Sequence, residues 1–175
     1  MVTEELLRLY AAGERNFTGV DLEGADLRGA ELPRITLIKA NLRRANLMGA
    51  NLYASGSMGA DLSGAILRGA NLTYIGLSCA NLQGADLRYA YLKSATLRKA
   101  DLRGANFEGA NLTDALLNNT RMDGINLDCT ILIGTNFEGS TPEFRFNGVL
   151  MGYNAFHYYT ILPDGTTFVG PNYSG

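Results

Sequence analysis

A large apolar residue recurs at every fifth position of this chain from Phe17 to Phe137. Of these 25 positions, 20 are leucine, three are phenylalanine and one is methionine, and the single exception is Ser57. An α-helix repeats its apolar face about every 3.6 residues and a strand about every 2 residues, so neither keeps a five-residue step on one side. The period therefore predicts a solenoid, in which the chain coils around a narrow axis lined with stacked side chains.

The other columns of the repeat support this interpretation. The position two residues before the leucine is alanine in 16 of 25 repeats, and residues two apart in an extended segment share one side, so both should face inward. The position just before the leucine is Asp or Asn in 15 repeats, and these side chains stabilise bends by bonding to nearby backbone. The position two after it is glycine in 13 repeats, where a tight turn can require positive φ.

The runs Ala25-Asp26-Leu27-Arg28-Gly29 and Ala105-Asn106-Phe107-Glu108-Gly109 resemble the pentapeptide-repeat family. The resemblance covers residues 15–139 and implies an all-β fold, a right-handed quadrilateral β-helix with four pentapeptides per coil. Twenty-five repeats would then form about six coils. The resemblance, and not the periodicity, gives the number of pentapeptides in one coil.

The exposed core at each end of a solenoid must be covered, which divides the chain into residues 1–14, 15–139 and 140–175. Residues 3–12 are predicted to form a short capping helix with Thr3 as its N-cap. Leu6, Leu9 and Tyr10 would cover the first coil, and Gly13 would end the helix.

Residues 140–175 are predicted to form a C-terminal cap that includes a hairpin over 161–168, with a Pro-Asp-Gly turn. Aromatic residues are concentrated in this segment, and such residues also favour a homodimer interface, which is compatible with a cap. The candidate cap and dimer residues are Phe144, Phe146, Tyr153, Phe156, Tyr158, Tyr159 and Phe168.

Ser57 interrupts the leucine column. Either Met58 turns inward to fill the gap or the coil is locally distorted, and we favour a bulge at this point.

The sequence offers no catalytic, cofactor or metal site. His157 is the only histidine, and the glycines fit neither the Walker nor the dinucleotide-binding spacing. On a four-sided solenoid Cys79 and Cys129 would lie on opposite faces, too far apart to pair or to share a metal ion. Without an export signal or a membrane span, a cytoplasmic location is expected.

The outer surface offers two candidate contact regions. Tyr53, Tyr74 and Tyr91 would share one face in successive coils, with Tyr89 at the neighbouring corner, and they form either a contact surface or a set of scattered surface tyrosines. Residues 28–103 carry eleven bases and four acids, which would steer an acidic partner or simply form a solvated wall.

We therefore expect a non-enzymatic structural or interaction module that presents its walls to an unidentified protein partner. The family resemblance also suggests a DNA-mimicking protein of the quinolone-resistance type that binds DNA gyrase, but mimicry needs a continuous acidic surface and the net charge here is only −2. Nucleic-acid binding through the basic middle is a third, less favoured function. No cofactor and no membrane contact are expected.

Overall fold

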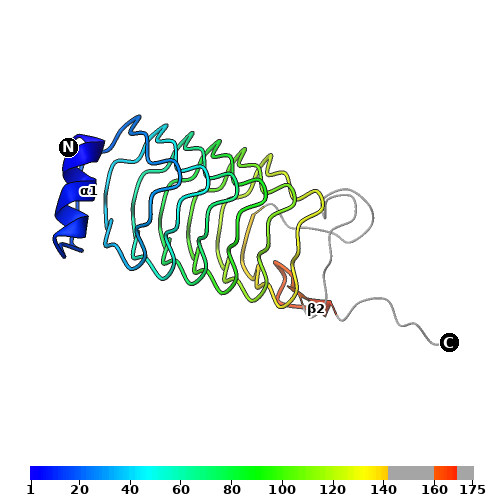
Figure 1. The fold of residues 1–175 in the computed structure, drawn as a ribbon. Coiled ribbons are helices and arrows are strands. Elements are labelled where there is room, and N and C mark those ends of the chain that lie inside the picture. The colour runs from blue at the N-terminus through cyan, green and yellow to red at the C-terminus, as the bar shows by residue number, and fades with distance from the viewer. Residues whose placement is uncertain (142–159, 169–175) are drawn as a thin grey trace.

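The computed structural model describes residues 1–141 and 160–168, which form a rod of stacked coils with a helix at its N-terminal end (Figure 1). Parallel β-bridges join residues twenty apart at 22 places, from Asn16–Thr36 to Arg121–Thr141. Twenty residues therefore complete one coil of four sides. We name the sides wall 1 to wall 4, beginning with residues 16–20, 21–25, 26–30 and 31–35 respectively, and each wall continues at intervals of twenty residues.

Each pentapeptide closes with a turn and bonds to the coil above it. In one example, the Ala45 N–H donates to the Leu42 carbonyl across the turn at 3.1 Å, and the Leu42 N–H donates to Asp61 in the next coil at 2.7 Å. The third residue of every turn has positive φ, the type II pattern, although 12 of the 25 are not glycine, among them Tyr74 at 60° and Lys99 at 59°. The backbone ladder thus imposes a left-handed conformation even on residues that do not favour it.

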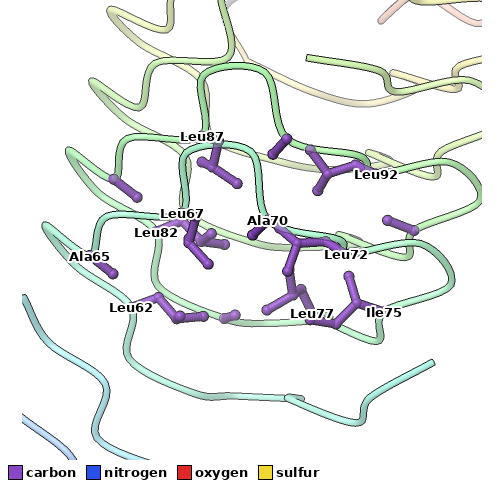
Figure 2. Packing of buried hydrophobic residues seen from close by; sticks show 14 of the residues in the cluster. Leu62, Ala65, Leu67, Ala70, Leu72, Ile75, Leu77, Leu82, Leu87 and Leu92 are labelled. Carbon is purple, nitrogen blue, oxygen red and sulfur yellow. The ribbon is translucent and has the colours of Figure 1, made fainter. Parts of the chain in front are cut away.

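The leucine and alanine columns face inward and form one continuous core, as Figure 2 shows around Leu67, Ala70 and Leu72. Where threonine or serine replaces alanine in this core, the buried hydroxyl group can donate a hydrogen bond to a backbone carbonyl of the preceding coil. For example, Thr130 Oγ1 donates to the Phe107 carbonyl in the preceding coil at 2.9 Å. Such bonds satisfy buried polar groups without disturbing the stack.

The bulge predicted at Ser57 is wrong. Ser57 points inward and is 2% exposed, whereas Met58 is 51% exposed. The coil stays regular, because the Ser57 N–H donates to Gly76 O at 2.7 Å and the Gly59 N–H to Ser78 O at 2.9 Å. The missing leucine instead leaves a cavity of about 10 Å³ next to Ser57, lined otherwise by leucine and isoleucine side chains.

Helix α1, Thr3–Ala11, covers the first coil. Leu6 is buried in the main core, Leu9 and Tyr10 pack against it, and the Tyr10 hydroxyl donates to the Pro33 carbonyl at 2.7 Å. Thr3 is not the N-cap as predicted: Val2 holds that position, with no side-chain capping bond.

The last described residues return to the end of the rod. Strand β1, Thr160–Ile161, pairs in parallel with Asn136 and in antiparallel fashion with β2, Thr167–Phe168. The turn between them contains Gly165 at φ 80°, so the predicted hairpin is present. The cap and dimer candidates lie outside the described residues, except for the backbone of Phe168 in β2, and their roles stay predictions.

Candidate protein-binding surface

The four tyrosines singled out from the sequence are all exposed on the outside of the rod. Their exposed fractions are 37% for Tyr53, 53% for Tyr74, 55% for Tyr89 and 57% for Tyr91. Tyr53, Tyr74 and Tyr91 come from successive coils of wall 4, and Tyr89 stands at the end of wall 3. Exposed rings on a rigid backbone offer contact area at low cost in conformational entropy.

Tyr53 and Tyr74 form a pair across two coils. Their ring centroids are 5.8 Å apart with the planes at 85°, an edge-to-face contact. The backbone holds both residues in place: the Tyr53 N–H donates to Asn51 Oδ1 at 3.1 Å, and the Tyr74 N–H donates to the Lys93 carbonyl at 3.0 Å. This pair is therefore organised before any partner arrives.

Tyr89 and Tyr91 flank the corner at Ala90. The Tyr89 ring lies over the backbone of the next coil, since a Cβ added at Gly109 would be only 2.6 Å from Tyr89 Cδ1. The glycine at 109 thus provides the space in which this ring rests. Among the described residues, no ring contact joins Tyr89 or Tyr91 to the Tyr53–Tyr74 pair.

The structure adds two apolar side chains, both on wall 3, that were not singled out from the sequence. Met48 and Ile66 on wall 3 are 44% and 36% exposed. Both occupy outward positions of the repeat, so their place in the pentapeptide was the signal that could have identified them. Ile133, further along wall 4, is 37% exposed. We call the four tyrosines and these three residues the aromatic surface.

Two arginines in the middle of the rod, Arg88 on wall 3 and Arg103 on wall 2, are each paired with an aspartate of their own wall. Arg88 Nε and Nη2 donate to the two carboxylate oxygens of Asp86 at 2.8 and 2.7 Å, and Arg103 contacts Asp101 in the same way. The hydrogen bonds from Arg88 hold the pKa of Asp86 below its usual range against the opposing effect of partial burial, and Arg103 does the same for the pKa of Asp101.

The described residues contain no group of three or more potential metal ligands. The cavity beside Ser57 is close to the size of one water molecule and is enclosed by core residues. No helix in the described part of the chain has the length and apolarity needed to cross a membrane.

Comparison with known proteins identifies the class of this rod. The family model for pentapeptide repeats matches residues 16–52, 58–74, 77–114 and 105–141, so the chain belongs to the pentapeptide-repeat family predicted from the sequence. Its structural relatives share the right-handed quadrilateral β-helix. Pentapeptide-repeat proteins are in general structural or interaction modules and not enzymes.

Three solved structures illustrate the similarity. HetL from Nostoc sp. strain PCC 7120, which is involved in the regulation of heterocyst differentiation, is 24% identical with a TM-score of 0.52, over 96% of this chain and 100% of HetL. The pentapeptide-repeat protein alr5209 from the same cyanobacterium is 37% identical over 66% of this chain and 80% of its own, with a TM-score of 0.31. The plasmid-mediated fluoroquinolone resistance protein QnrB1 is 18% identical over 81% of each chain, with a TM-score of 0.40. No curated protein sequence matches this chain significantly.

Proposed function

We propose that this protein is a non-enzymatic interaction module that binds a protein partner through its aromatic surface. The observation that carries the proposal is the Tyr53–Tyr74 pair, two exposed rings in mutual contact on a backbone fixed by inter-coil hydrogen bonds. Rigid, partly exposed aromatic residues are the side chains that most often dominate binding energy at protein interfaces. The regular interior supplies stiffness, and the variable outer positions supply specificity.

The distribution of charge supports this function over mimicry of DNA. Residues 28–103 hold eleven bases and four acids, a net charge of +7 in the middle of the rod. A protein surface that binds the negative phosphates of duplex DNA would be repelled by the net positive charge in the middle of this rod. An excess of this protein is therefore expected to leave gyrase supercoiling unchanged.

Affinity capture from the native host tests the proposal. The wild type is compared with a variant in which Tyr53, Tyr74 and Tyr91 are all changed to alanine, and with a variant in which all three become phenylalanine. The phenylalanine variant keeps the rings and should retain the partner, whereas the alanine variant should lose it. A Ser63→Ala, Gln83→Ala variant on the opposite wall 2 is the control, and identical partners for all four proteins would refute a role for these rings.

A further inference from the structure

Wall 1 differs in charge from wall 2 beside it and from wall 3 opposite it. Residues 36–40, 56–60, 76–80, 96–100 and 116–120 contain no carboxylate. Walls 2 and 3 place Asp61, Asp86 and Asp101 in the same coils. We call the outward-facing side of residues 36–40, 56–60, 76–80 and 96–100 the wall 1 shelf.

Unpaired cations stand at both ends of this shelf. Lys39 lies in its first coil and Arg98 and Lys99 lie in its last, all three exposed. No ion pair within the described residues involves them, in contrast to the carboxylate-bound Arg88 and Arg103. Their charge is therefore available to an external anion.

Between these cations, the floor of the shelf is the outward surface of residues 56–60 and 76–80, which is built mostly from small residues. Gly56 and Gly59 lie in the second coil and Gly76 in the third, and Met58 is the one large side chain there, 51% exposed. The Lys39 stem leans onto this floor, since a Cβ added at Gly59 would be 3.6 Å from Lys39 Cγ. The shelf thus has an apolar centre between two positive ends.

The distance between the ends matches an extended peptide. Lys39 and Lys99 occupy the same position in the repeat three coils apart, which is about 14 Å at the usual spacing between strands. In an extended chain, residues four apart lie on the same side and are also separated by about 14 Å, with the residue midway between them on that side too. That central residue would face Met58.

We propose that the wall 1 shelf binds an extended acidic segment of a partner protein, with two carboxylates four residues apart and an apolar side chain midway between them. This inference concerns a different wall and a different chemistry from the aromatic surface and does not depend on it. The shelf has no outward-facing aromatic ring on which bases could stack. A long nucleic acid would also run past the acidic ends of the chain, where residues 1–27 carry six acids and two bases, whereas a short acidic segment stays within the basic middle.

Fluorescence anisotropy with a labelled peptide, Ser-Glu-Ser-Leu-Ser-Glu-Ser, tests the proposal. The wild type should bind this peptide better than the version with glutamine in place of both glutamates. The double variant Lys39→Gln, Lys99→Gln should weaken binding by about tenfold, through the loss of two charge pairs. The matched control, Arg68→Gln, Lys93→Gln, removes two exposed cations from walls 3 and 4 and should leave the affinity unchanged.

Equal weakening in both double variants would show a nonspecific effect of net charge and would overturn the proposal, as would equal binding of the glutamine peptide. Stronger binding of a single-stranded oligonucleotide, lost with Lys39 and Lys99, would assign the shelf to nucleic acid instead. Peptide binding by the variant with alanine at Tyr53, Tyr74 and Tyr91 should equal that of the wild type. That arm separates a failure of this inference from a failure of the aromatic surface.

Discussion

Shortening one leucine in the middle of the rod tests the solenoid core directly. Leu87 is fully buried and lies in the same column as Leu67 in the preceding coil, as Figure 2 shows, and as Phe107 in the next coil. Leu87→Ala removes three buried carbons, worth about 2.4 kcal/mol at about 0.8 kcal/mol per methylene. The hydrogen-bonded coils on both sides limit collapse into the space, so the cavity adds to this cost and the total loss should be about 2–5 kcal/mol.

Urea denaturation followed by circular dichroism measures the change, and the midpoint of thermal unfolding should fall by about 5–15 °C. Lys93→Ala, an exposed substitution in the next pentapeptide, is the control and should change stability by no more than about 0.5 kcal/mol. A loss below about 0.5 kcal/mol for Leu87→Ala would refute the reasoning, because a side chain that is inexpensive to remove does not lie in a dry core.

Four further substitutions probe other parts of the repeat. Ser57→Leu should raise the free energy of unfolding by about 1–2 kcal/mol by filling the cavity beside it. If urea denaturation instead gave a lower free energy of unfolding, the neighbouring leucines would already have closed around the serine. Gly49→Ala should cost about 1 kcal/mol and Ala54→Gly should gain a similar amount, since both turn positions have positive φ; opposite signs in thermal melts would contradict this conformational argument. Arg88→Gln removes the partner that lowers the pKa of Asp86 in the folded protein. The substitution should therefore destabilise the protein by its full amount above about pH 4, and this destabilisation should disappear as the pH falls through the lowered pKa. Melting curves of both proteins across this pH range test the prediction. A difference in melting temperature between them that does not change with pH would mean that the ion pair contributes nothing to stability.

The fold could be predicted from the sequence because every five-residue unit contains the same residue types and makes the same local contacts. Leucine and alanine two apart face inward, and the aspartate or asparagine between them bonds to the backbone, as Asn41 Oδ1 does by accepting from the Arg43 N–H at 3.2 Å. Local chemistry of this kind repeats without reference to distant residues. The N-terminal helix and the hairpin over 161–168 were predicted for the same reason, from turn residues and apolar spacing.

The outcome at Ser57 depended on the coils above and below it. A serine in a leucine column predicts a bulge when its pentapeptide is considered alone, but hydrogen bonds to the flanking coils hold the backbone in register and leave a cavity instead. The same ladder holds Tyr74 and Lys99 at positive φ, which their own preferences oppose.

The sequence by itself determined the inward columns, the turns and the family, because these follow from contacts within a few residues. Only the tertiary structure decided which exposed side chains meet. Tyr53 and Tyr74 touch, and Lys39 leans over Gly59, because residues about twenty apart in sequence lie one strand spacing apart in space. The candidate surfaces therefore arise from stacking, while the core that supports them arises from the repeat.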